Sequence, residues 1–425
     1  MAKEADSMCE LARVSKGGMS QTYGFIEKVE VHMQRSLIKA LIGICALALL
    51  LGYGLSASNA MSNQGKVILM RTPDGGIQPQ AVVDDGGAVH LIYFKGNPAA
   101  GDIFYVRKAP QDAGFSKAIR VNSQPGCAIA LGNIRGAHIA VGRGGRIHVA
   151  WMGSKEAEPK GPSKATPMLY TRLNDALTGF DPQRNVMQFA VGLDGGGSIA
   201  ADRSGNVYVA WHAGAGEEGE ALRRVWVARS TDEGKTFKRE VPASDKATGA
   251  CGCCGMRAFA ARNNAFYMLY RAATESVNRD MYLITSQDNG TSFQSTLMHK
   301  WKLEACPMST AAIGESHDGI LVAWETDGQV YYSNIEPGTS KPLQSIPAPG
   351  AGSRRKHPAI IGNAQDETLL AWTEKMGWQR GGSLAWQIFD KQGQPTAEKG
   401  QAEGVPVWSL VTVYASPEGS FTIVY

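Results

Sequence analysis

The chain has 425 residues, a formal net charge of +4, 43% hydrophobic residues and 19% charged residues. This composition is typical of a globular protein with enough apolar residues for a sizeable core, and the length suits two average domains or one large all-β domain. The balanced charge, with no basic block, argues against nucleic acid as a partner.

The first predicted element is an export signal at residues 33–60. A basic stretch containing Arg35 and Lys39 precedes the apolar residues 40–51, and small residues lead up to Ala60. This order is that of a secretory signal peptide with its cleavage site. The alternative is a membrane anchor, but the apolar stretch is shorter than the ~20 residues that a span requires, so we expect no permanent anchor.

The signal divides the chain into an N-terminal extension with signal peptide, residues 1–60, and one mature domain, residues 61–425. The mature chain is expected to begin at Met61 and to be exported to a periplasm or the cell exterior. Met33 stands where such a signal would start, which favours translation from Met33 over translation from Met1.

One pattern recurs seven times in the mature region: a turn with Gly, Asn or Asp, then a short apolar strand that ends in Trp or Tyr. The aromatic ends are 48 to 60 residues apart. A period near 50 residues, with short strands and Gly turns, is typical of a β-propeller. The aromatic residues are Tyr93, Trp151, Trp211, Tyr270, Trp324, Trp372 and Tyr425.

Each of these strands follows another strand-like run, and six of them precede a third. We therefore predict an all-β propeller with seven blades favoured and six as the alternative, built from inner strands A and B, a C strand and a weaker D strand. The chain stops at the end of the seventh B strand. The run KVILMRT, residues 66–72, has no blade of its own and is predicted to close the ring by completing the last blade.

Two eight-residue turns carry a shared motif, STDEGKTF at 230–237 and SQDNGTSF at 286–293. Their aspartates can accept backbone N–H groups, while their glycines supply the positive φ that the turn needs. We interpret both motifs as structural. The residues concerned are Asp232, Gly234, Asp288 and Gly290.

These motifs resemble the Asp boxes of the sialidase superfamily, the BNR-repeat β-propellers, and the resemblance covers roughly residues 65–425. It implies a sialidase-like protein directed at a glycan, with exo-α-sialidase-type hydrolysis as one activity. One family arginine enters a C strand just before an Asp box, a place that Arg279 matches; Arg223 has the same offset one blade earlier. Glu275 would supply the carboxylate, whereas no tyrosine stands in the family's nucleophile position, so catalysis stays open.

In a propeller the D–A and B–C loops share one face, so residues on these loops should gather around the channel. Arginines there suit bidentate capture of a carboxylate, which indicates a glycan or another small anionic ligand as partner. The candidate catalytic residues are Arg271, Glu275 and Arg279, and the candidate ligand-binding residues are Arg135, Arg223, Arg354, His357 and Trp378.

Five cysteines remain after residue 60, and four of them precede the A strands of two neighbouring blades, in CGCC and CPM. We expect these segments to meet. Disulfides are the favoured interpretation in an exported protein, and no cofactor is favoured. The alternative is a soft, copper-type metal site, because thiolates and thioethers suit Cu(I). Its ligands would come from Cys251, Cys253, Cys254, Cys306 and Met308.

A non-catalytic binding propeller is the third open function, and the sequence leaves the oligomeric state unknown.

Overall fold

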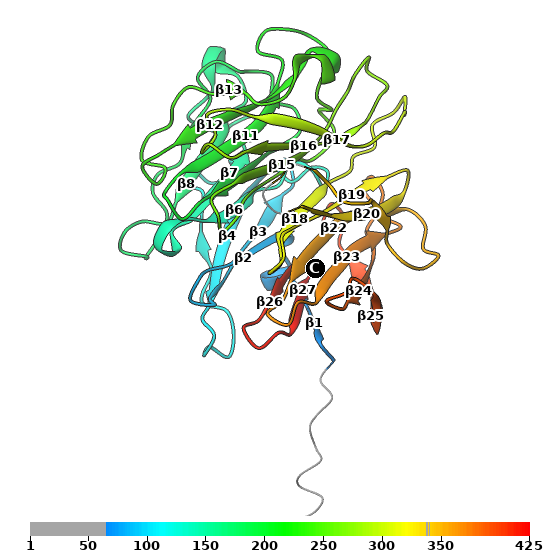
Figure 1. Cartoon of the computed structure of the whole chain (residues 1–425). Coiled ribbons are helices and arrows are strands. Elements are labelled where there is room, and N and C mark those ends of the chain that lie inside the picture. Colours follow the sequence, from blue (N-terminus) through cyan, green and yellow to red (C-terminus); the bar gives the residue numbers. More distant parts are fainter. Residues whose placement is uncertain (1–64, 337–338, 340) are drawn as a thin grey trace, which may run out of the picture. The chain divides into compact units, whose positions relative to one another are not determined.

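The computed structural model describes residues 65–336, 339 and 341–425, and these form a ring of seven small β-sheets (Figure 1). The predicted signal peptide, the start at Met61 and the two cysteines before residue 60 lie outside the described residues. In the part of the chain that is described, no helix is long and apolar enough to cross a membrane.

Six blades are meanders of four antiparallel strands in the order A, B, C, D. The first three blades contain β2 (Ile77–Val83), β3 (Val89–Asn97), β4 (Ala100–Lys108) and β5 (Ile119–Arg120); β6 (His138–Val141), β7 (Ile147–Met152), β8 (Met168–Arg172) and β9 (Arg184–Asn185); and β10 (Gly197–Ala201), β11 (Val207–Ala213), β12 (Arg224–Ser230) and β13 (Val241–Pro242).

The next three blades have the same order of strands. They contain β14 (Arg257–Ala260), β15 (Phe266–Arg271), β16 (Met281–Ser286) and β17 (Gln294–His299); β18 (Ala311–Glu315), β19 (Ile320–Thr326), β20 (Gln329–Ile335) and β21 (Ile346–Pro347); and β22 (Arg355–Gly362), β23 (Thr368–Glu374), β24 (Gly382–Phe389) and β25 (Pro395–Val405). The only helices in the described residues are single 3₁₀ turns: η1 (Pro73–Gly75), η2 (Arg143–Gly145), η3 (Pro162–Lys164), η4 (Glu220–Leu222) and η5 (Lys246–Thr248).

The seventh blade joins both ends of the described chain. It has the order β26 (Thr412–Ala415), β27 (Phe421–Val424) and β1 (Val67–Met70), and β1 lies beside β27 in Figure 1. The two pair in parallel, with Val67 opposite Phe421 and Met70 opposite Val424. The predicted seven blades and the closure by the N-terminal strand are thus confirmed.

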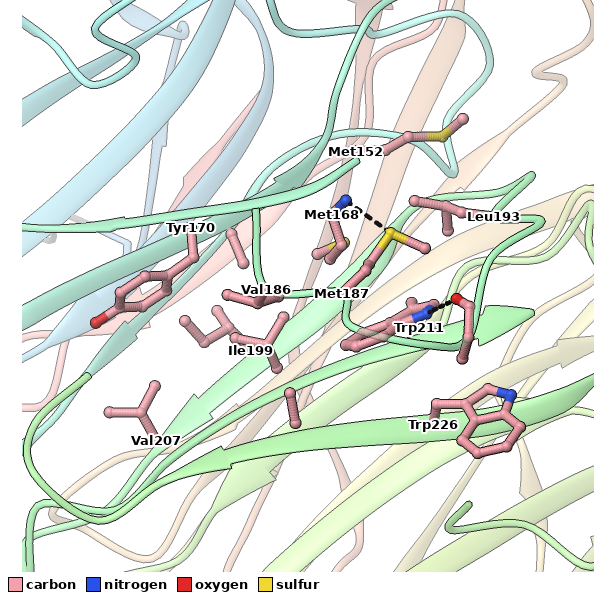
Figure 2. Close-up of a cluster of buried hydrophobic side chains, with 14 of the residues drawn as sticks. Met152, Met168, Tyr170, Val186, Met187, Leu193, Ile199, Val207, Trp211 and Trp226 are labelled. Carbon is pink, nitrogen blue, oxygen red and sulfur yellow. Dashed lines mark hydrogen bonds between the residues drawn. The ribbon is translucent and has the colours of Figure 1, made fainter. Parts of the chain in front are cut away.

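The core lies between the blades, where apolar faces of neighbouring sheets stack. Figure 2 shows the contact of the second and third blades, in which Met168 and Tyr170 of β8 face Ile199 and Trp211 of the next sheet. The Trp211 Nε1–H donates to the carbonyl of Ala190 at 2.9 Å. The four tryptophans that end B strands are at most 3% exposed, which confirms that they pack blades. They are Trp151, Trp211, Trp324 and Trp372.

The predicted D strands are weak in four blades, where they have two residues each, but β17 and β25 have six and eleven. β25 is mostly exposed, and its backbone pairing with β24 extends from Pro395 to Val405.

Both predicted Asp boxes form the turns between C and D strands. Asp232 accepts hydrogen bonds from the hydroxyls of Ser230 and Thr236, both at 2.6 Å, and from the Thr236 N–H at 2.9 Å. Gly234 has φ +74°, and its N–H donates to Ser230 Oγ at 2.8 Å. Asp288 and Gly290 repeat these contacts with Ser286 and Ser292, as the shared motif requires.

A cavity of about 870 Å³ runs along the ring axis and is lined by residues of all seven A strands. One end meets the loop that precedes β6, residues 128–136, which we call the cap loop. Asn133 donates to the carbonyl of Ser409 in the seventh blade, and the Gln78 amide donates to two carbonyls of the loop at 2.9 Å. The cap loop therefore crosses the mouth of the channel on the face formed by the D–A and B–C loops.

Candidate functional site

Three cysteines gather in the loop that leads into β14. The Sγ atoms of Cys251 and Cys253 are 3.3 Å apart, those of Cys251 and Cys254 are 3.4 Å apart, and all three lie within 4.8 Å of one another. Cys251 and Cys254 are buried and Cys253 is half-buried. We call this group the cysteine cluster; it is the only group of this kind among residues 65–336, 339 and 341–425.

Backbone hydrogen bonds fix the loop that carries the cluster. The Cys251 N–H donates to the Arg271 carbonyl at 2.9 Å, and the Gly255 N–H donates to the Ser309 carbonyl at 2.9 Å. The loop is therefore held between β15 of its own blade and the segment that precedes β18. The sequence predicts that CGCC and CPM meet; the contacts are made by Ser309, which directly follows CPM, and Cys306 takes no part in them.

A chain of donors ends on Cys254. The Arg271 guanidinium donates to Ser309 Oγ at 3.2 Å, and the Ser309 hydroxyl donates to Cys254 Sγ at 3.8 Å. Burial opposes a charged sulfur, but the hydrogen bonds from Cys251 and Cys253, with the nearby Arg271, hold the pKa of Cys254 well below its ordinary value. The hydrogen bond with Cys253 lowers the pKa of Cys251, but the contact with Cys254 and burial outweigh it and raise that pKa overall. The contacts with Cys251 and Cys254, together with partial burial, raise the pKa of Cys253. Of the three sulfur atoms, that of Cys254 is therefore the one whose surroundings most favour negative charge.

Beside the cluster runs a chain of ion pairs from four D–A and B–C loops. Arg135 and Arg223 contact the two oxygens of Asp194 at 3.2 and 3.7 Å. Arg223 and Arg279 contact the two oxygens of Glu220 at 3.6 and 2.7 Å. Three guanidinium groups against two carboxylates leave an excess of one positive charge. Glu220 also accepts the N–H of Gly252, inside the CGCC segment, at 3.1 Å, which ties this arginine–carboxylate chain to the cluster.

Of the predicted catalytic residues, Arg271 is the last residue of β15, and Glu275 and Arg279 lie on the loop that follows it. Arg271 is 2% exposed and donates to the carbonyls of Arg279 and Glu325, which makes it a brace between the fourth and fifth blades. Arg279 is 4% exposed, and its two terminal nitrogens donate to Glu220 and to the Ser276 carbonyl, whereas its Nε has no hydrogen-bond partner among the described residues. Glu275 is exposed and accepts the Asn278 amide at 3.4 Å, so the structure does not bring its carboxylate to Arg279.

The other predicted ligand-binding residues are spread over the same face and below it. Trp378 is 56% exposed and its ring lies 5.7 Å from that of Trp408, between centroids. Arg354 is exposed on the loop before β22. His357 is 3% exposed; it lines the axial cavity and contacts Thr310 Oγ1 through Nδ1 at 3.2 Å.

The predicted disulfides are not formed in the structure, where every described cysteine is free. Sulfur separations of 3.3 and 3.4 Å exceed the ~2.05 Å of a disulfide. Cys306 is exposed and stands outside the cluster, because the chain brings Ser309, three residues further on, beside Cys254. Met308 packs its methyl group near Gly132 of the cap loop instead.

Sequence reasoning missed Ser309, Asp194 and Glu220. It selected arginines and sulfur residues on these loops and passed over the carboxylates on the same loops. The acidic stretch GEEGE before η4 is the signal that could have drawn attention to Glu220. Ser309 carries no such signal, because a single serine after CPM is not distinctive.

The fold and the sheet order make this chain a seven-bladed β-propeller protein. No family model matches the sequence, and no curated protein matches it. Among solved structures the chain is similar to the Hadza microbial sialidase Hz136 (13% identity, 79% of this chain and 75% of that one, TM-score 0.46). It is also similar to a protein of unknown function from Dyadobacter fermentans (11% identity, 73% of this chain and 93% of that one, TM-score 0.47). A third similar structure is a variant of the NanB sialidase from Streptococcus pneumoniae (12% identity, 83% of this chain and 66% of that one, TM-score 0.44). No residue role is carried over from them.

Proposed function

We propose that this protein is an exported propeller that binds a thiophilic metal ion at the cysteine cluster, and that Cu(I) is the preferred ion. The observation that carries the proposal is the convergence of three sulfur atoms within 4.8 Å of one another. Soft thiolate ligands select Cu(I), and Cys-x-Cys-Cys matches none of the usual zinc spacings.

The surroundings fit a thiolate–metal centre. Binding removes protons from thiols and leaves negative charge on sulfur, which the excess positive charge of the arginine–carboxylate chain offsets. The donor chain from Arg271 through Ser309 reaches the sulfur of Cys254, where it would stabilise the negative charge of a metal-bound thiolate. Outer contacts of this kind orient ligands and commonly change metal affinity by ~10–100-fold.

The test is a Cu(I) titration of the reduced mature chain, without oxygen, against a chromogenic Cu(I) chelator. We expect one ion per chain, a loss of affinity far above ~10–100-fold for Cys253→Ser or Cys254→Ser, and a loss within ~10–100-fold for Ser309→Ala. Cys306→Ser is the matched control, because that cysteine is exposed and outside the cluster.

Two results would contradict the metal proposal. One is an unchanged Cu(I) affinity in Cys254→Ser. The other is an intact mass showing that exported protein carries a disulfide within the cluster, combined with no metal uptake after reduction.

A second candidate is binding of an anionic glycan on the same face, as the sequence resemblance suggests. It is favoured by the exposed Trp378 beside Trp408, since exposed indole rings can stack on sugars. Hydrolysis receives less support, because capture of a carboxylate by Arg279 would have to break its ion pair with Glu220. An assay with a sialoside, for binding and for release of sialic acid, with Trp378→Ala as the variant, separates binding from catalysis.

Export itself and the division into residues 1–60 and 61–425 belong to this proposal. A mature chain from Met61 would place the cluster in a compartment where thiols meet oxidants. Metal ligation would then protect the thiols from disulfide formation. The mass of the protein recovered outside the cytoplasm checks the cleavage site.

A further inference from the structure

Below the cap loop, the axial cavity carries a ring of polar side chains contributed by successive blades. Gln80, His138, Arg257, Thr310 and His357 all line it. Arg257 is the first residue of β14, and one of its guanidinium nitrogens donates to Gln80 Oε1 of the first blade at 2.5 Å. This bond joins the A strands of the first and fourth blades across the axis.

Arg257 has no negative partner. In the described part of the chain no carboxylate forms an ion pair with it, whereas Arg135, Arg223, Arg279 and Arg355 all have one. Burial alone lowers the pKa of Arg257 to about 10, so the guanidinium is still protonated at neutral pH. Arg257 is partly exposed on the cavity wall, so its charge, which no carboxylate of the described chain neutralises, is open to an anionic ligand.

The two histidines of the ring add hydrogen-bonding groups but no charge. Burial and Arg257 lower the pKa of His138 to about 3, and burial and Lys356 lower that of His357 to about 3. Each histidine forms a hydrogen bond between its Nδ1 and a neighbouring hydroxyl: His138 with Ser198 at 2.7 Å and His357 with Thr310 at 3.2 Å. Both imidazoles are therefore neutral and fixed in orientation.

Further along the axis the lining becomes apolar. Val82, Val141, Phe259 and Ile361 are partly accessible and line the same cavity. At the far end, the turns between A and B strands bring charges back, with Arg203 paired to Asp85 across two blades. One end of the cavity thus presents a lone cation among neutral polar groups, and its middle presents apolar surface.

We infer that the axial cavity binds a small organic acid, with its carboxylate at Arg257 and its apolar body along Val82, Val141, Phe259 and Ile361. A carboxylate matches the fork of a guanidinium and accepts further hydrogen bonds from neutral donors. The volume of about 870 Å³ falls in the range of small-molecule sites. This site is separate from the cysteine cluster and does not depend on the proposed metal function.

The experiment is a calorimetric titration of the mature chain in chloride-free buffer with three ligands. Hexanoate has both a carboxylate and an apolar body, 1-hexanol has the apolar body alone, and sulfate has the negative charge alone. Hexanoate should bind more tightly than either of the others. Arg257→Met should weaken hexanoate by ~10–100-fold, the usual worth of a charge-assisted hydrogen bond, and Arg257→Lys by less. Arg262→Met is the matched control, because that arginine lines the far end and contacts Glu315 at 3.7 Å.

Two further readouts keep the test decisive. Without ligand, Arg257→Met should melt close to the wild type, because removal of an unneutralised charge offsets the loss of the hydrogen bond to Gln80. Hexanoate should also shift the methyl resonance of Ile361, which lines the cavity. Equal affinity in Arg257→Met, sulfate binding as tightly as hexanoate, or a sharp loss of stability in Arg257→Met would each overturn the inference.

Discussion

In each Asp box, one aspartate side chain stabilises a whole turn between C and D strands. Asp232 accepts three hydrogen bonds within its turn, and Phe237 of the same box packs edge-on against Tyr170 of the preceding blade at 4.8 Å between ring centroids. The box therefore links a local turn to the contact between two blades.

Asp232→Ala is expected to lower the free energy of unfolding by ~1–3 kcal/mol, because it leaves the donors of the turn without their acceptor. Chemical denaturation of the mature chain measures this loss. Metal binding should persist in the folded variant, because the box lies on the opposite face from the cysteine cluster. Lost binding with unchanged stability would contradict this structural role.

The difference in unfolding free energy between the wild type and Asp232→Ala should become smaller at acid pH. Burial opposes the charge, but the hydrogen bonds from Ser230 and Thr236 lower the pKa of Asp232 to about 2 from an ordinary value of 3.8. A depressed folded-state pKa contributes stability that is present above the unfolded value and lost as pH falls through the folded one. The gap in stability between wild type and Asp232→Ala should thus shrink between about pH 4 and pH 2, and a gap independent of pH would count against it.

At the scale of elements, the repeat predicted the blades well because each blade obeys the same local rules. Short apolar strands, turns with Gly, Asn or Asp, and a terminal aromatic recur in every copy, so β3, β7 and β11 fall where the sequence places them. The closing strand β1 was also predictable, since a seventh blade without a C strand needs one.

The candidate site was less predictable, because long-range contacts between unlike loops decide it. The sequence placed Arg279 and the cysteines on the correct face, but their partners depend on how the third and fourth blades pack. Nothing local indicates that Glu220 reaches Arg279, or that Ser309 rather than Cys306 lies beside Cys254. Arg257 was passed over for the same reason: its isolation is a property of the closed ring.

The cap loop gives a test at the scale of an element. Gly196, with φ +47°, lies against it so closely that a Cβ would stand 2.3 Å from the Ile134 carbonyl oxygen. Gly216 also has a positive φ, +97°, but a Cβ there would meet nothing within 4 Å. Gly216→Ala should therefore cost only the ~1–2 kcal/mol of backbone strain, and Gly196→Ala should cost clearly more. Thermal melting compares the two variants. Equal losses of stability would show that the cap loop moves aside for the added Cβ at little cost.

At the scale of the whole molecule, stability rests on closure of the ring. Each blade packs on two neighbours, and the last blade has a third strand only because β1 returns to it, with backbone bonds from Phe421 to Lys66 at 2.8 Å and from Tyr425 to Met70 at 3.0 Å. The Arg71 guanidinium also stacks on the Tyr425 ring at 4.0 Å. Both ends of the propeller are thus tied in one sheet, and unfolding of either end should release the other.

Deletion of residues 61–72 is expected to lower the free energy of unfolding by about 2–4 kcal/mol, because it exposes the apolar surface that β1 covers, at ~1.5–3 kcal/mol for each fully buried side chain. It also leaves β27 as an unpaired edge strand, which favours association between chains. Deletion of residues 61–65 is the matched control, since β1 begins at Val67. Melting and size-exclusion chromatography should show a less stable, self-associating protein for the longer deletion alone. Identical behaviour of the two truncated chains would mean that the six complete blades hold the ring closed without β1.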